Sequence, residues 1–151
     1  MNLLVFTKRV PATQEEELRI IDDGNKIDLS KVPFKVNDWD NYSVEEAVRI
    51  VEKTGGTVTA VSIGDSESDE VLRRAIAMGA KDGFLIETEN ILHDPNARST
   101  LIYNFLKKEG LPFDAIFTGV QSEDDQFAAV GGILAAKLRI PFVSMVIGID
   151  N

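Results

Sequence analysis

Apolar residues along this chain follow two alternating patterns. Short runs of continuous apolar residues are typical of strands that are buried on both faces of a parallel sheet. They occur at 2–7, 57–63, 83–86, 115–118 and 142–149. Between these runs apolar residues recur every three to four positions, which indicates amphipathic helices over about 41–54, 67–78, 97–109 and 126–138. Strands that alternate with helices in this way predict an α/β fold.

The expected architecture is a single domain, 1–151, with a doubly wound, mainly parallel sheet of five strands and helices on both of its faces. The predicted strand order is 3-2-1-4-5, which makes the first run, 2–7, a central strand. The side chains expected in the core are Leu4, Phe6, Val58, Ala60, Val61, Phe84, Ile116 and Phe117.

Two smaller features interrupt the alternation. The β-prone runs 18–21 and 26–29 flank an Asp-Gly turn, which predicts a small inserted hairpin that projects from one edge of the sheet. Residues 32–36 continue from it in extended form. Asp40, Asn41 or Ser43 is expected to cap the first long helix, and Gly55 with Gly56 to end it.

Composition and charge exclude several classes of function. The net charge of −9 argues against nucleic acid and anionic membrane as partners, because both need basic surfaces. The absence of cysteine excludes disulfides, thiolate metal sites and cysteine catalysis. The first apolar run is too short for a signal peptide and no stretch reaches transmembrane length. We therefore expect a cytoplasmic protein.

Catalysis and metal binding by this chain are not expected. His93 is the only histidine and lies in a polar connection beside Asp94 and Pro95. The acidic pair Asp124 and Asp125 is more typical of a solvated face than of a metal site. No nucleophile is combined with a base and an orienting group.

A ligand site is predicted in the stretch 115–132. A buried strand ends at Gly119, a polar loop follows, and a helical pattern begins at about Gln126. In an open α/β sheet, ligands bind beyond the carboxyl ends of the strands, and the free N–H groups of a helix start suit phosphate. The residues alone leave open whether this loop binds a ligand or is an ordinary connection with a solvated tip.

The run GVQSEDDQFAAVGG at 119–132 resembles the signature loop of the small (beta) subunit of electron transfer flavoproteins. Its Gly-Val-Gln-Ser opening looks most like the variant of bacterial members that serve amine dehydrogenases. Further blocks match in order and spacing at 3–11, 37–50, 58–65 and 72–86. The resemblance extends over nearly the whole chain and implies an adenine-nucleotide-binding, three-layer fold of the HUP type.

The resemblance implies a heterodimer that carries electrons from dehydrogenases on FAD held mainly by the alpha subunit. The beta subunit in most members binds AMP as a structural ligand, and bifurcating members place a second flavin there. The cofactor-binding residues carried over to this chain are Phe6, Asn37, Asp38, Trp39, Asp40, Ile63, Gly119, Val120, Gln121, Ser122, Glu123, Asp124, Asp125, Gln126, Phe127, Ala128, Ala129 and Val130.

Different residues are expected to contact different parts of the ligand. Phe6 and Ile63 contact the adenine or ribose, Gln121 and Asp124 fix the loop or ribose, and main-chain N–H groups at 127–130 hold phosphate. The chain departs from the family at Ala129, where a polar side chain is usual, and in the acidity of the loop. Each loop charge some 8 Å from a phosphate is expected to weaken phosphate binding by roughly 2 kcal/mol at an effective dielectric of about 20. Exposed carboxylates that point away from the phosphate would weaken it much less, because solvent screens them.

Family beta subunits are longer than this chain, so we interpret it as a truncated beta subunit that folds but exposes apolar surface and tends to self-associate. An alternative from another class is a stand-alone ATP- or AMP-binding domain of the universal-stress type. Such domains carry Gly-rich phosphate loops, and here Lys8 and Arg9 follow the first strand and Ile133 follows Gly132. A third alternative is a scaffold subunit that binds no ligand at this site.

Overall fold

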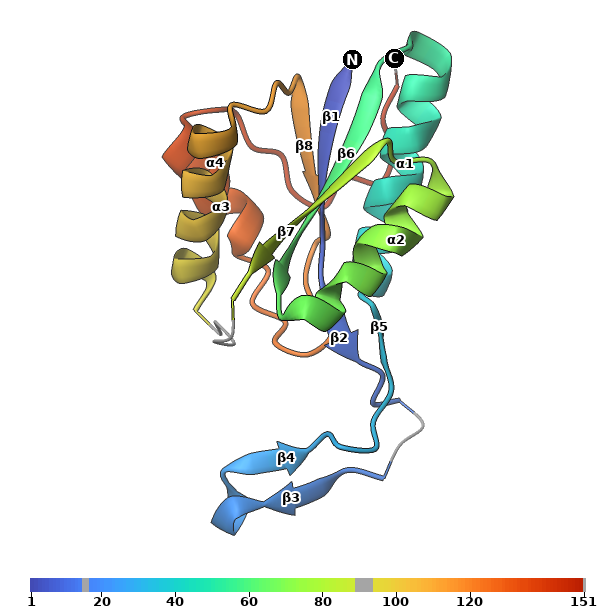
Figure 1. Cartoon of the computed structure of the whole chain (residues 1–151). Helices are drawn as coiled ribbons and strands as arrows, with labels where there is room; N and C mark the ends of the chain where they lie inside the picture. Colours follow the sequence, from blue (N-terminus) through green and yellow to red (C-terminus); the bar gives the residue numbers. More distant parts are fainter. Residues whose placement is uncertain (15–16, 89–93, 151) are drawn as a thin grey trace.

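The computed structural model describes residues 1–14, 17–88 and 94–150. Its main sheet contains β1 (Asn2–Thr7), β6 (Thr57–Gly64), β7 (Asp82–Glu87) and β8 (Ala115–Thr118). The strands are all parallel, in the order β7-β6-β1-β8. This confirms the predicted order for the first four main strands and the central place of the first one (Figure 1).

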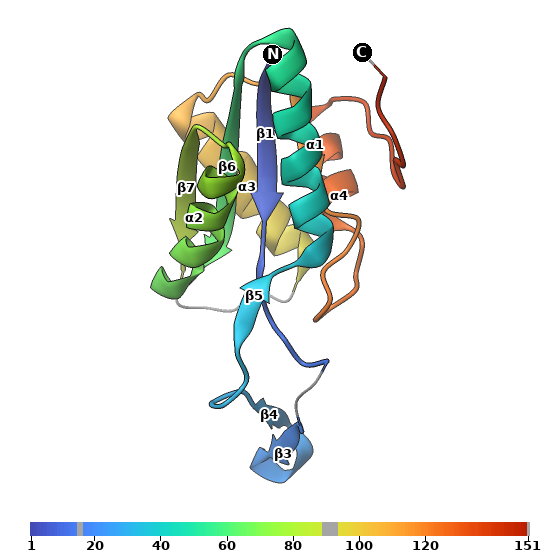
Figure 2. The same cartoon turned by 90° about the vertical axis from the view of Figure 1, so that its right-hand side faces the viewer.

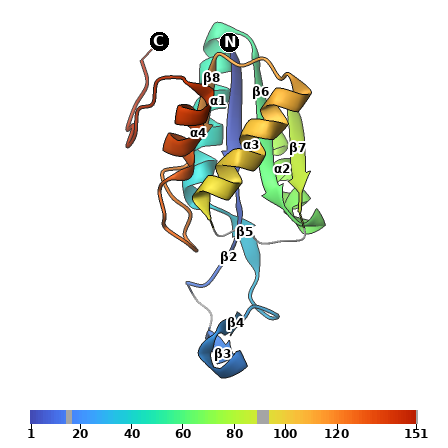
Figure 3. The ribbon, with the colours of Figure 1, turned by 90° about the vertical axis from the view of Figure 1, so that its left-hand side faces the viewer.

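Two helices cover each face of the sheet. Helices α1 (Asp38–Thr54) and α2 (Asp69–Met78) lie on one face (Figure 2), and α3 (Pro95–Glu109) and α4 (Val130–Leu138) lie on the other (Figure 3). Because side chains alternate along a strand, β1 supplies both cores. Leu3 and Val5 pack under α1 and α2, whereas Leu4 and Phe6 pack under α3 and α4. The apolar run of β1 is continuous because both of its faces are covered by helices.

The predicted core is confirmed for the central strands. Leu4, Phe6, Val58, Ala60 and Val61 are buried. The other three expected core residues are only half-buried, because they lie on the two outer strands of the described sheet; they are Phe84, Ile116 and Phe117.

The predicted hairpin forms, but its position differs from the prediction. Strands β3 (Arg19–Ile21) and β4 (Lys26–Asp28) pair antiparallel around a short turn, Asp22–Gly24. The hairpin extends beyond the carboxyl end of β1 and does not leave the sheet at one edge (Figure 1). The chain reaches it through β2 (Arg9–Pro11) and returns through β5 (Phe34–Val36), which pair antiparallel with each other. β2 continues the direction of β1, so the insertion lies beyond the carboxyl ends of the strands (Figure 1).

The predicted last strand, 142–149, is wrong. Residues 140–150 form no strand, and Met145 has a φ of +57°, which is outside the range of strand backbone. An apolar, β-branched run forms a strand only when an adjacent edge accepts its hydrogen bonds and helices cover its faces. Here Val143 and Ile147 remain 75% and 105% exposed, while Ile149 packs against the core near α1.

Three helix boundaries also differ. Helix α1 begins at Asp38, so its N-cap is Asn37 and none of the predicted caps. Helix α3 begins at Pro95, two residues earlier than predicted. Its N-cap is Asp94, whose side chain accepts hydrogen bonds from the main-chain N–H groups of Asn96 and Ala97. Helix α4 begins at Val130 and not near Gln126.

His93 lies outside the described residues. Within the described ranges, no helix combines the length and apolarity needed to cross a bilayer.

Candidate nucleotide-binding site

An open cleft lies at the carboxyl ends of β1, β6 and β8. Its empty volume is about 770 Å³, including the part that opens to solvent. Its floor is formed by the ends of the strands, and its walls by the loop 119–129 and by the starts of α1, α3 and α4. The predicted residues that line it are Phe6, Asn37, Asp40, Ile63, Gly119, Val120, Gln121, Ser122, Asp125, Phe127, Ala128, Ala129 and Val130.

Gly119 brings the end of β8 against the first turn of α1. A Cβ atom at this position would lie 2.1 Å from Oδ1 of Asp40 and 3.1 Å from Cβ of Trp39. Only glycine therefore permits this close approach. Gly131, in the first turn of α4, has a similar role, because a Cβ there would lie 2.6 Å from the hydroxyl of Thr118.

Asn37 holds the loop in place through both ends of its amide. Its Nδ2 donates to the carbonyl of Gln121 at 2.9 Å, and its Oδ1 accepts from the N–H of Glu123 at 3.1 Å. The residue is 1% exposed, and its main-chain N–H donates to the carbonyl of Lys8. Asn37 therefore connects the end of β1 with the loop. Both polar atoms of the Asn37 side chain are therefore engaged within the protein.

Asp40, in the first turn of α1, is a buried carboxyl group that lines the cleft. Its Oδ2 accepts from the main-chain N–H of Lys8 at 2.8 Å. Burial raises the pKa of Asp40 to about 7, although hydrogen bonds from the Asn37 side chain and from the N–H groups of Lys8 and Gly119 favour the charged form. Asp40 thus links α1 to the ends of β1 and β8, the two strands that bound the cleft.

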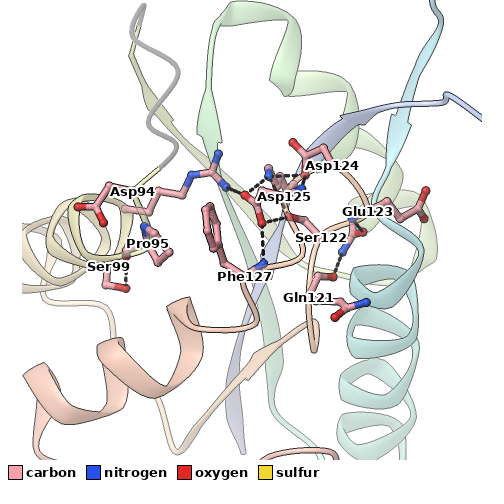
Figure 4. Close-up of polar contacts among 12 residues, drawn as sticks. Asp94, Pro95, Ser99, Gln121, Ser122, Glu123, Asp124, Asp125 and Phe127 are labelled. Atoms are coloured by element: carbon pink, nitrogen blue, oxygen red, sulfur yellow. Dashed lines mark hydrogen bonds and ion pairs between the residues drawn. The ribbon is translucent and has the colours of Figure 1, made fainter. Parts of the chain in front are cut away.

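Asp125 collects four donors inside the cleft. Its Oδ2 accepts from the ammonium of Lys8 at 2.9 Å and the guanidinium of Arg98 at 3.2 Å. Its Oδ1 accepts from the hydroxyl of Ser122 at 2.7 Å and the main-chain N–H of Phe127 at 3.2 Å. Figure 4 shows Asp125 where these contacts converge, beside Ser122 and Phe127. Burial alone would raise the pKa of Asp125, but the hydrogen bonds from Lys8 and Ser122 outweigh it and lower the pKa.

The other two acidic side chains of the loop do not line the cleft, and each has a cationic partner. Asp124 pairs with Lys8 at 2.6 Å, and Glu123 pairs with Lys35 at 3.0 Å. Lys35 also pairs with Asp38 at 2.9 Å. The sequence did not distinguish among the three loop acids and left open whether they lie near a phosphate or point away from it. In the structure each has a basic partner, and only Asp125 lines the cleft.

Some predicted site residues lie around the cleft without lining it. Trp39 is 42% exposed and packs edge-on against Tyr42, with ring centroids 6.4 Å apart. The others that do not line the cleft are Asp38, Glu123, Asp124 and Gln126. Asp124 still acts on the site, because it shares the ammonium of Lys8 with Asp125.

Sequence reasoning missed several lining residues, which are Thr7, Lys8, Val61, Pro95, Arg98, Ile102, Thr118 and Gly131. A signal existed for Lys8, since it directly follows the central strand and ligands bind at that end of a parallel sheet. Thr7 is also notable, because its Oγ1 is buried and has no hydrogen-bond partner among the described residues. Arg98 comes from the first turn of α3, and no local pattern places it near the loop.

Comparison with known proteins assigns the family. The model of the electron transfer flavoprotein domain matches residues 25–151. The chain is 35% identical over 148 residues to the electron transfer flavoprotein subunit beta of Bacillus subtilis (strain 168), covering 97% of this chain and 56% of the relative.

It is 36% identical over 146 residues to the subunit beta of Thermoanaerobacterium thermosaccharolyticum, covering 97% of this chain and 55% of the relative. It is 32% identical over 157 residues to protein FixA of Azotobacter vinelandii, covering 100% of this chain and 55% of the relative. The chain thus spans about half the length of these curated relatives. The family model and these relatives show that the chain belongs to the electron transfer flavoprotein family.

Proposed function

We propose that this chain is the nucleotide-binding portion of an electron transfer flavoprotein beta subunit. In this proposal it holds AMP as a structural ligand and pairs with an alpha subunit that carries FAD. FAD supplies the redox chemistry when it is bound, and dehydrogenases are served through the heterodimer. The chain itself is not an enzyme: its residues bind and position the nucleotide and shape the surface that surrounds it.

The observation that carries the proposal is the position of the cleft. The chain passes from β1 to β6 and β7 on one side and then returns to β8 on the other side of β1. The carboxyl ends of β1 and β8 therefore form the topological switch point, where open α/β sheets bind nucleotides. The cleft is lined by Phe6 and Thr7 of β1 and by Thr118 of β8. Membership of the family supports the same site.

The chemistry of the lining fits an adenylate. Phe6, Ile63 and Ile102 provide apolar surface for the base. The hydroxyl of Thr7 is buried and has no hydrogen-bond partner among the described residues. The side chain of Gln121 lines the cleft, so both residues can serve the ligand. Helix α4 begins without a side-chain cap, which leaves its first N–H groups for a phosphate.

The direct experiment identifies the small molecule that the purified chain releases on denaturation, by mass and by absorbance. AMP supports the proposal, whereas a flavin indicates the bifurcating form of the site. ATP or ADP would favour the universal-stress type of function. Release of no molecule, together with no binding of added AMP, would refute a nucleotide site.

A pair of matched variants tests the location of the site. Gln121→Ala removes a side chain that lines the cleft, and we expect AMP affinity to fall by about 1–3 kcal/mol because a polar ligand atom loses its partner. Gln126→Ala makes the same chemical change in the same loop, at an exposed side chain outside the cleft, and should leave affinity unchanged. Calorimetry that finds equal AMP affinity for Gln121→Ala and the wild type would remove Gln121 from the site.

A further inference from the structure

The ammonium group of Lys8 is fully engaged by the loop 119–129. It donates to the hydroxyl of Ser122 at 2.9 Å, to Asp124 at 2.6 Å and to Asp125 at 2.9 Å. An ammonium group has three N–H donors, and these contacts use all of them. Although Lys8 lines the cleft, it therefore acts on a ligand through the loop and not by a hydrogen bond of its own.

The main chain of Lys8 is held at the carboxyl end of β1. Its N–H donates to Oδ2 of Asp40 at 2.8 Å, and its carbonyl accepts from the N–H of Asn37 at 2.9 Å. Its side chain is only 19% exposed, and partly buried charges are screened much less than charges at the surface. The ammonium group therefore places a positive charge at a defined position under the loop.

The two acids that Lys8 contacts depend on it to different degrees. Asp125 also pairs with Arg98 at 3.2 Å, whereas Lys8 is the one cation that pairs with Asp124 among the residues that the structure describes. Oδ1 of Asp124 also accepts from the N–H of Asp125 at 3.0 Å, which keeps this carboxylate next to a residue that lines the cleft. Without Lys8, the loop would carry an uncompensated negative charge beside the cleft.

We infer that Lys8 is a positioning residue for a phosphate-bearing ligand: its ammonium group compensates the charge of Asp124 and fixes the acidic part of the loop, so that a phosphate binds at the start of α4 close to carboxylates. This inference rests on the proposed nucleotide site and adds to it the group that makes an acidic loop compatible with an anion. The phosphate itself is held by the free N–H groups of the helix start. Lys8 acts on it through the charge and position of the loop.

Calorimetry with AMP on the full chain tests this role, at low ionic strength, where charges are least screened. Lys8→Met removes the charge and keeps an apolar side chain, and AMP affinity should fall at least about fivefold because the unpaired carboxylate repels the phosphate. The double variant Lys8→Met/Asp124→Asn removes both charges and should bind AMP within about threefold of the wild type. Lys53→Met makes the same change in net charge at an exposed lysine in the last turn of α1, outside the cleft, and should leave affinity unchanged.

The outcomes separate this inference from the proposed function. Failure of every protein, the wild type included, to bind AMP refutes the nucleotide site itself. Wild-type affinity in Lys8→Met refutes the role of Lys8 and keeps the site. Equally weak binding by Lys8→Met and the double variant does the same, because it shows that Lys8 only maintains the shape of the loop.

A single substitution of opposite sign keeps the inference testable if Lys8→Met does not fold. Asp124→Asn leaves Lys8 paired with Asp125 and removes one negative charge, so AMP affinity should rise about threefold. Asp22→Asn is its matched control, because Asp22 is exposed and pairs with Lys26 in the hairpin; it should leave affinity unchanged. Unchanged or lower AMP affinity in Asp124→Asn overturns the inference.

Discussion

The buried carboxyl of Asp40 should make the stability of the protein fall as pH rises towards neutrality. Its pKa is raised from 3.8 to about 7, chiefly by burial. Between these values the unfolded chain ionises Asp40, whereas the folded protein keeps it protonated, so folding takes up a proton. Stability then decreases with pH, because the folded state binds more protons than the unfolded state. The contribution is complete below about pH 4 and lost as pH rises through about 7.

The magnitude follows from the size of the shift. The pKa of Asp40 differs between 3.8 in the unfolded chain and about 7 in the folded protein. At 1.36 kcal/mol per pKa unit, the free energy of unfolding therefore falls by about 4 kcal/mol from the acidic to the alkaline limit. Asp40→Asn removes the titration but places an amide NH₂ where one oxygen accepted a main-chain N–H, which costs about 1–3 kcal/mol. We therefore expect the wild type to lose stability relative to the variant as pH rises, and the variant to be the more stable of the two at pH 8.

Urea unfolding followed by far-UV circular dichroism from pH 4.5 to 8.5 measures this difference directly. Relative to Asp40→Asn, the wild type should lose about 1.4 kcal/mol per pH unit below pH 7 and then level off. Asp38→Asn is the matched control: Asp38 lies two residues away but is exposed, and its hydrogen bond with Lys35 lowers its pKa. Its curve should run parallel to that of the wild type. Parallel curves for the wild type and Asp40→Asn would refute the reasoning.

Two further predictions concern packing and exposed surface. Gly119→Ala should cost about 1–3 kcal/mol in urea unfolding, because its Cβ would lie 2.1 Å from Asp40. Gly148→Ala, which meets nothing within 4 Å, should stay within about 0.5 kcal/mol, and equal costs for the two variants would contradict the packing argument. Self-association of the chain should decrease in sedimentation experiments when three exposed apolar side chains become serine, since exposed apolar patches favour association; a monomeric wild type at high concentration would contradict this. These side chains are Val143, Met145 and Ile147.

The parts of the fold that could be predicted are those in which local pattern and burial agree. The first strand is apolar at every position from Leu3 to Phe6 because helices cover both of its sides. The run 142–149 is also mainly apolar but forms no strand. The composition of a segment indicates that it is suited to a buried strand. It does not show whether a neighbouring strand is available for pairing or whether helices cover both faces, so prediction from the apolar pattern fails at the edge of a sheet.

The start of α4 was predicted too early for a related reason. Phe127, Val130, Leu134 and Leu138 have helical spacing, but Gln126 and Ala128 adopt φ values of +53° and +52°. The N–H of Phe127 donates to Asp125 rather than to a helical carbonyl. Hydrogen bonds within the loop therefore override the apolar period. Phe127 becomes part of the cleft wall, 55% exposed, instead of a core residue of the helix.

The electrostatics of the site depended on contacts that no local pattern contains. From the sequence, Glu123, Asp124 and Asp125 form one acidic run, and their charges simply add. In the fold, Lys8 comes from the end of β1 and Arg98 from the first turn of α3, and they meet the loop from two directions. The potential at the cleft is set by which carboxylate these cations hold and how deeply it is buried. Of these three acids only Asp125 lines the cleft, so its charge affects the potential there more directly than the charges of the other two, although all three are equal in the sequence.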